Sequence, residues 1–130
     1  MTALDTNVVV RFLVNDDDQQ AQRARALIAA GNVHIPPTVL LETEWVLRSA
    51  YGFGAGDILI FFRALLGLPG VSVGASMQIA VALKGYEQGL DFADALHLAF
   101  SADAETFATF DTQLLRRTRR MHGMIKVIAA

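Results

Sequence analysis

The chain has 130 residues, a length that fits one domain with a sizeable buried core. The absence of cysteine excludes disulfides, thiolate metal sites and cysteine nucleophiles, and the net charge of −2 excludes a surface that grips nucleic acid over its whole extent. Hydrophobic residues make up 53% of the chain, which is rich for a small monomer, so we expect part of the apolar surface to contact another chain.

The first element is a short apolar strand that ends at Asp5, and a helix is expected over 7–14. In an open α/β sheet, functional groups gather beyond the carboxyl ends of the strands, which makes Asp5 the first candidate site residue. Capping of the following helix is the alternative role for this acid. The acids of 16–18 then open a second helix, closed by Gly31, and a short strand follows at 33–35.

The clearest helix is expected over 37–50, with a proline in its first turn and Thr38 as a possible cap. Glu42 and Glu44 are two residues apart, so they cannot both face one site. Glu42 shares its stripe with apolar residues, whereas Arg48 can neutralise Glu44 one turn away. Periodicity therefore slightly favours Glu42 as the inward acid.

A helix over 57–66 is expected to be apolar on nearly every side, which is typical of a buried helix or of an interface. Two interpretations stay open for it, a surface that binds a partner and simple burial in the core. A third strand at 71–73 and a helix over 76–88 follow, and Gly89 closes that helix.

The segment after Gly89 carries Asp91 and Asp94 at the start of another helix, three residues apart and therefore on one face. Capping explains Asp91 as well as a functional site does. His97 continues the same face, but a single histidine without partners at ligand spacing is not typical of a metal site.

A last β-prone run, 106–110, repeats the opening pattern and ends at Asp111, with Thr109 just before it. A helix over 113–120 and a strand over 125–128 complete the chain. Four arginines lie close together in this region and form either a solvated helix face or a local contact with nucleic acid. They are Arg116, Arg117, Arg119 and Arg120.

The alternation of strands and helices runs without a linker or repeat, which predicts one α/β domain over residues 1–130. We expect a central, mostly parallel sheet of about four or five short strands with helices on both faces. Four acids can then converge on one sheet edge, with Asp91 beside them. They are Asp5, Glu42, Asp94 and Asp111.

Carboxylates held close together repel one another unless cations lie among them. Oxygen ligands without histidine or cysteine favour Mg²⁺ or Mn²⁺ over zinc. Such ions can activate water and orient a phosphate, so the acids fit a metal-dependent hydrolase of phosphodiester bonds.

Four segments resemble the motifs of PIN-domain proteins, and their order and the chain length resemble VapC-type toxins. The segments are 4–8, 39–47, 91–95 and 109–111. The resemblance implies a metal-dependent endoribonuclease whose catalytic acids, Asp5, Glu42, Asp94 and Asp111, bind Mg²⁺ or Mn²⁺, and it selects Glu42 over Glu44. Asp91 matches an additional acid of many members, and Thr6, Asn7 and Thr109 match polar residues that hold the acids or a metal-bound water.

The resemblance also implies a homodimer and a cognate VapB-like antitoxin that silences the toxin near its acids, which would give the helix over 57–66 a partner. The arginine cluster then becomes a candidate contact for the RNA backbone. The chain shows neither a secretory signal nor an apolar run near the ~20 residues of a membrane span, so we expect a cytoplasmic protein that does not bind membranes.

Two other α/β classes require residues that the chain lacks, and a third alternative keeps the PIN fold but has no catalytic activity. A response-regulator receiver domain needs an acid next to Asp5 and another after the third strand. A haloacid-dehalogenase-like phosphatase needs an aspartate where this chain has Asn7. The main alternative is a PIN-fold binding or regulatory module that acts in a DNA-bound toxin–antitoxin complex without significant RNA cleavage.

Overall fold

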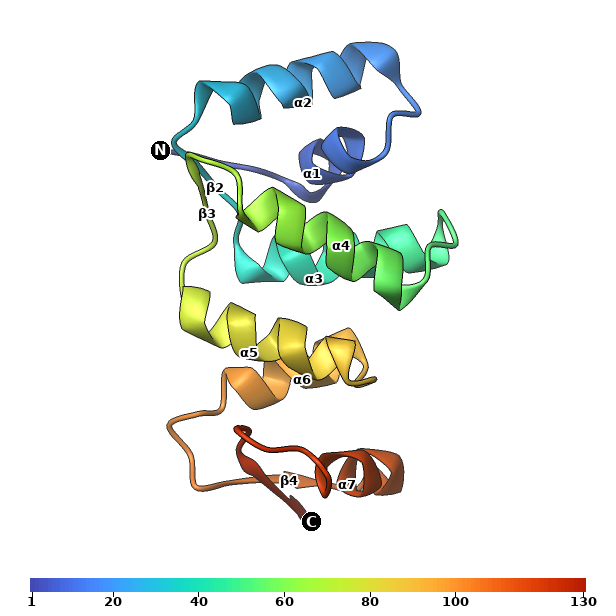
Figure 1. The fold of residues 1–130 in the computed structure, drawn as a ribbon, viewed down its shortest axis with the longest axis vertical. Helices are drawn as coiled ribbons and strands as arrows, with labels where there is room; N and C mark the ends of the chain where they lie inside the picture. Colours follow the sequence, from blue (N-terminus) through green and yellow to red (C-terminus); the bar gives the residue numbers. More distant parts are fainter. The chain divides into compact units, whose positions relative to one another are not determined.

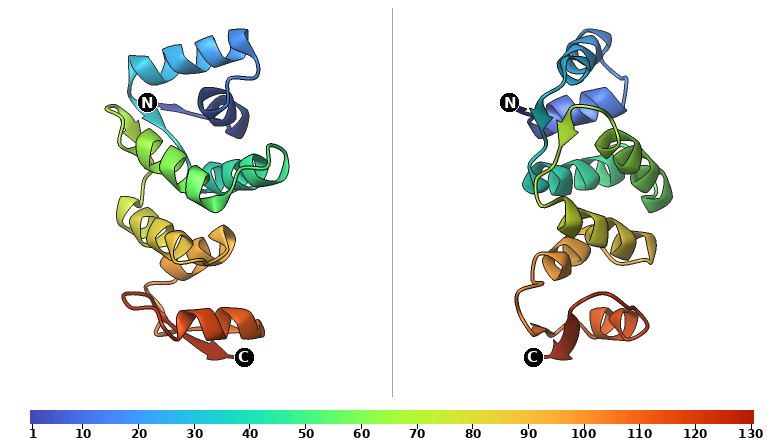
Figure 2. Two further views of the ribbon diagram at one scale, coloured as in Figure 1. Left: turned by 45° about the vertical axis from the view of Figure 1, so that its right-hand side comes forward. Right: turned by 60° about the vertical axis from the view of Figure 1, so that its left-hand side comes forward.

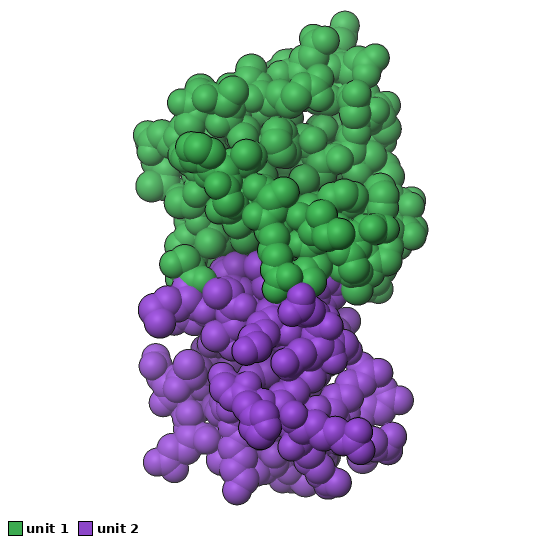
Figure 3. All heavy atoms as spheres, viewed as in Figure 1, with its two compact units in different colours: residues 1–76 green, residues 77–130 purple.

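One or two helices separate each strand from the next along the chain, as the sequence predicts. The computed structural model describes residues 1–130, which form two units, residues 1–76 and residues 77–130 (Figure 3). The helices are α1 (Thr6–Leu13), α2 (Asp18–Ala30), α3 (Pro37–Ser49), α4 (Ala55–Leu66), α5 (Ser76–Glu87), α6 (Phe92–Ala99) and α7 (Thr112–Thr118). The strands are β1 (Thr2–Ala3), β2 (Val33–His34), β3 (Val71–Ser72), β4 (Thr106–Thr109) and β5 (Lys126–Ala129). None of the helices combines the length and the apolar character that crossing a bilayer requires.

The first unit contains a three-stranded parallel sheet in the order β1-β2-β3. Val33 of β2 pairs with Thr2 on one side and with Val71 on the other, and its own side chain is buried. Gly70, just before β3, has a φ of +77°, and a Cβ there would lie 2.7 Å from the Cα of Gly31. Only glycine fits this approach of the two turns that lead into β2 and β3.

The helices of the first unit bury one stripe each against the sheet or one another. α1 packs against α2 and α3, and α3 packs against α4 (Figures 1 and 2). In α4 the side chains of Ile58, Leu59, Phe62 and Leu65 are buried, whereas Ile60 is 65% exposed. Core packing therefore accounts for one face of this apolar helix, and the face around Ile60 is left for solvent or a partner.

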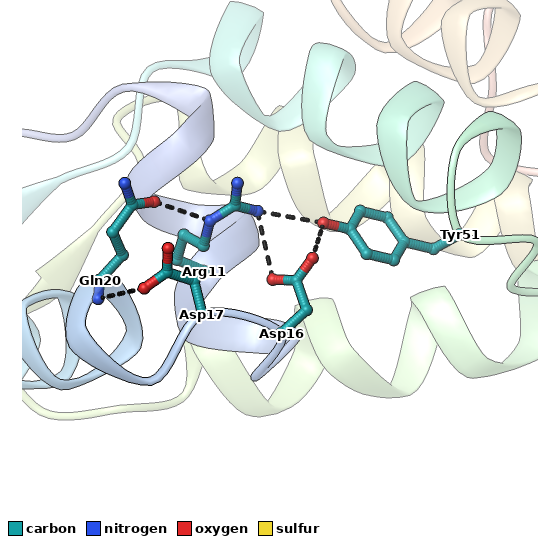
Figure 4. Close-up of polar contacts among 5 residues, drawn as sticks. All are labelled: Arg11, Asp16, Asp17, Gln20 and Tyr51. Carbon is teal, nitrogen blue, oxygen red and sulfur yellow. Dashed lines mark hydrogen bonds and ion pairs between the residues drawn. The ribbon is translucent and has the colours of Figure 1, made fainter.

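A polar network fastens the loop between α1 and α2 (Figure 4). The guanidinium of Arg11 donates to Gln20 at 2.8 Å and to the Tyr51 hydroxyl at 3.0 Å, and it pairs with Asp16 at 3.3 Å. The Tyr51 hydroxyl in turn donates to Asp16 at 2.6 Å. Asp17 caps α2 by accepting from the Gln20 amide, as expected of an acid at a helix start.

The second unit contains a two-stranded parallel sheet in which Thr106 pairs with Lys126 and Thr109 with Ala129. α7 packs on both strands (Figure 2). In α5 and α6 the buried rings of Tyr86 and Phe92 meet edge to face with centroids 5.0 Å apart.

Two expectations about the fold need correction. All strand pairings are parallel, as expected, but the strands pair in two small sheets of three and two rather than in one. The cap of α3 is Pro36, not Thr38, and no side chain bonds its first amides. The physical reason is that Pro37 has a fixed φ and no N–H, so it occupies the first helical position and leaves Thr38 inside the helix.

Candidate functional site

Asp5 lies at the carboxyl end of β1, where the sequence predicts it. The buried Leu4 donates its amide to the His34 carbonyl at 2.9 Å and so continues the pairing of β1 with β2. Asp5 then caps α1, and its Oδ1 accepts the Thr6 amide at 2.8 Å. Since capping uses one carboxylate oxygen, the same exposed side chain can cap α1 and present Oδ2 to a ligand.

Thr6 links Asp5 to Glu42 within the first unit. Its side chain is only 5% exposed, and its hydroxyl donates a hydrogen bond to Oε1 of Glu42 on α3. Its backbone amide binds Asp5 at the same time. Two of the candidate acids, 37 positions apart in sequence, are thus joined through one buried threonine.

The structure corrects the assignment of the inward acid on α3. Glu42 is exposed, whereas Glu44 is 2% exposed and lies in the buried stripe with Leu40 and Leu47. Arg48 pairs with Glu44 at 3.0 Å, as expected, and this pair offsets the cost of burying the carboxylate. Periodicity was a poor guide here because a paired glutamate can occupy a core position of a helix.

Asn7 makes no hydrogen bond to either acid. Its exposed side chain lines a cavity of about 240 Å³ beside α1 and α2, together with Arg11, Gln20 and Arg23. The resemblance implies that polar neighbours hold the acids in place. Of the two residues Thr6 and Asn7, only Thr6 makes hydrogen bonds to Asp5 and Glu42.

Asp91 and Asp94 share one end of α6, as their spacing predicts. Asp91 is the N-cap, and its Oδ2 accepts the Asp94 amide at 3.3 Å. The pKa of Asp94 is raised, first by partial burial and then by the negative charges of Asp91 and Asp111, while His97 and Arg117 act in the opposite direction. Asp91 and Asp111 therefore each lie within electrostatic range of Asp94.

Asp111 caps α7 and follows β4 after one intervening residue. Its Oδ1 accepts the amides of Gln113 at 2.9 Å and of Leu114 at 3.2 Å. Its own amide donates to the Thr109 hydroxyl at 3.0 Å. Thr109 and the first turn of α7 thus hold Asp111 from both sides and leave its Oδ2 without a hydrogen bond.

The arginine cluster divides into two kinds of residue. Arg117 donates to the Gly89 carbonyl at 3.1 Å and lies close enough to Asp94 to lower its pKa. Arg116, Arg119 and Arg120 are exposed and form no ion pair. These three arginines are therefore available to bind an anionic ligand.

A divalent cation fits the chemistry of these donors. They are carboxylate oxygens, the ligands that Mg²⁺ and Mn²⁺ prefer, and each capping aspartate has one oxygen to spare. At the distances seen within each unit, no three His, Asp or Glu side chains are grouped closely enough to hold an ion. The first unit offers the pair Asp5 and Glu42, and the second offers Asp91, Asp94 and Asp111.

Comparison with known families gives one match. The family model described as the PIN domain matches residues 2–120, a range that includes every acid discussed above. The comparison with curated proteins gave no match.

Proposed function

Because the chain belongs to the PIN domain family, whose members are typically metal-dependent nucleases, we propose that it is a metal-dependent endoribonuclease and the toxin of a VapC-type toxin–antitoxin pair. The observation that carries the proposal is the contact of Thr6 with both Asp5 and Glu42, because it ties together two of the acids that the family motifs select. A hydrogen bond from the buried Thr6 hydroxyl to the exposed Glu42 carboxylate holds that carboxylate in one orientation, as is typical of carboxylates that bind metal ions.

In this proposal residues 1–130 act as one PIN domain, whose acids are those that the family motifs select. Asp5, Glu42, Asp94 and Asp111 would hold Mg²⁺ or Mn²⁺, with Asp91 beside them. When bound, such an ion activates water and balances the charge of the scissile phosphate.

The chain's own residues then have distinct roles. Thr6 keeps Oε1 of Glu42 in place, and Thr109 fixes the backbone at Asp111. Asp91 holds the first turn of α6, from which Asp94 projects.

The proposed substrate is RNA, and the unpaired arginines near the end of α7 are candidates for contact with its phosphates. A homodimer in the cytoplasm, neutralised by a cognate VapB-like antitoxin, completes the proposal. The exposed face of α4 around Ile60 is available for such a protein contact.

The test is cleavage of transfer and ribosomal RNA by the purified protein, with 5′ ends mapped, in Mg²⁺, in Mn²⁺ and in a chelator. We expect cleavage that depends on the cation and is lost in Asp5→Asn. Asp17→Asn is the matched control, because Asp17 caps α2 as Asp5 caps α1, and asparagine is as good a cap as aspartate. Both variants keep a cap and lose one charge, but only the first removes a proposed ligand.

Equal activity of the two variants would contradict the assignment of Asp5. Absence of cleavage with either cation, combined with binding of operator DNA by the toxin–antitoxin complex, would favour a regulatory module without significant nuclease activity.

A further inference from the structure

Phe110 is the most exposed of the large hydrophobic side chains, at 88%. It stands between β4 and α7, directly before the candidate acid Asp111. The hydrogen bond from the Asp111 amide to the Thr109 hydroxyl spans this residue and fixes the backbone on either side of it. A phenylalanine exposed at the tip of a fixed turn gains nothing from burial in the fold, and its ring is free to contact a ligand.

The chain around Phe110 is polar and charged rather than apolar. Thr109 and the exposed Asp111 flank it, the exposed, unpaired Arg116 lies in α7, and Arg119 and Arg120 follow directly after that helix. Arg116 lies in the second turn of α7, about 6 Å along the helix axis from Thr112. An exposed aromatic ring followed along the chain by free arginines is a combination that suits single-stranded nucleic acid.

A protein interface fits this surface less well. A stable interface covers about 800 Å² on each partner, whereas one aromatic side chain supplies about 150–250 Å². The neighbours Asp111, Thr112 and Gln113 would add polar groups and a charge to such an interface. A single aromatic face matches the size of a single base.

We propose that Phe110 is a stacking platform for an unpaired base of the RNA substrate, and that Arg116, Arg119 and Arg120 bind the phosphates of neighbouring nucleotides. This inference rests on the proposed ribonuclease function for the identity of its ligand. It assigns a binding role to a residue outside the acids and makes unpaired RNA the preferred substrate.

The test measures equilibrium binding of a short unstructured RNA to the full chain in a chelator, where metal-dependent cleavage cannot proceed. We expect Phe110→Leu, which keeps an apolar side chain but lacks a ring, to weaken binding about 5- to 100-fold, and Phe110→Tyr to bind as wild type. Phe100→Leu is the matched control, because Phe100 is also exposed, at 48%, but does not adjoin an acid. Annealing the RNA to its complement, or removing its bases, should weaken binding to wild type and leave Phe110→Leu little changed.

Salt dependence separates the ring from the arginines. Replacing the three arginines with glutamine should lower the slope of log affinity against log salt by about 2, at about 0.7 per phosphate contact on a single strand. Phe110→Leu should weaken binding and leave the slope unchanged.

The single tryptophan of the chain gives a direct readout of stacking. Combining Trp45→Phe with Phe110→Trp moves the only indole to position 110, where unpaired RNA should quench its emission and abasic RNA should not.

Wild-type affinity in Phe110→Leu, or equal binding of the abasic strand to wild type, would overturn the inference. A change in self-association of Phe110→Leu with unchanged RNA affinity would do the same and would assign the ring to a protein contact. If wild type fails to cleave RNA but shows the expected binding pattern, the proposed activity is wrong and the stacking site stands.

Discussion

The hydroxyl of Thr6 donates a hydrogen bond to Oε1 of Glu42 and so joins the first turn of α1 to α3. The donor is buried, whereas the acceptor belongs to an exposed carboxylate. An exposed glutamate would otherwise sample several rotamers, at an entropic cost each time it engaged a ligand. The bond removes part of that freedom before any ligand arrives.

Thr6→Val should therefore reduce activity more than stability. Valine has nearly the volume of threonine but no donor, and the released Glu42 carboxylate can be solvated by water. We expect kcat/KM for RNA cleavage to fall about 10- to 100-fold, as is typical when a hydrogen-bond partner of a metal ligand is removed. Thr6→Ser, which keeps the hydroxyl, should retain most of the activity. Equal rates in wild type and Thr6→Val would mean that the bond only packs α1 against α3.

Asp91 and Asp94 should differ in the effects of their removal. Asp94 is half-buried among charges, whereas Asp91 is an exposed cap whose Oδ2 binds the Asp94 amide. We expect Asp94→Ala to abolish cleavage and Asp91→Ala to weaken it, with a loss of about 1 kcal/mol of unfolding free energy from the missing cap. Asp91→Asn should restore that stability. Equal loss of activity from Asp91→Asn and Asp94→Ala would instead make Asp91 a direct ligand.

Local sequence signals predicted the positions of Asp5 and Asp111 well. Each acid follows a short strand and precedes a helix, and these boundaries are encoded by neighbouring residues. The capping roles of Asp5 and Asp91 were also among the alternatives that the sequence left open, whereas the capping role of Asp111 was not predicted.

Local sequence signals did not predict the tertiary contacts. The bond from Thr6 to Glu42 spans 36 positions, and no spacing rule reveals it, although the adjacency of Thr6 to a candidate acid was a hint. Periodicity favoured Glu42 as the inward acid and so missed the burial of Glu44, whose ion pair with Arg48 makes an inside position tolerable. The division of the strands into two sheets depends on pairing partners, which short β-prone runs do not specify.

Tyr51 makes stability depend on pH at the alkaline end. Its pKa is raised above the ordinary 10.0, chiefly because its hydroxyl donates to Asp16, while the bond from Arg11 opposes the rise. A raised folded-state pKa gives stability that is complete below the unfolded pKa and is lost as the pH rises through the folded value.

Urea unfolding tests this dependence. Tyr51→Phe should lower the free energy of unfolding by about 1 kcal/mol near pH 8, and the difference from wild type should shrink above about pH 10. Asp16→Asn, alone and combined with Tyr51→Phe, measures the coupling of the two side chains. A difference that stays constant to high pH would show that the hydroxyl does not titrate in this contact.

Thr43 is the one fully buried side chain whose polar atom has no partner. Its hydroxyl on α3 is inaccessible and makes no hydrogen bond. A buried hydroxyl without a partner costs about 1–3 kcal/mol, and valine has nearly the same shape and a similar helix propensity. Thr43→Val should therefore raise the free energy of unfolding by about 1 kcal/mol, measured by urea denaturation. Thr43→Ser, which keeps the hydroxyl and removes a methyl group, should lower it. Destabilisation by Thr43→Val would mean that the hydroxyl gains a partner in solution, such as a buried water molecule.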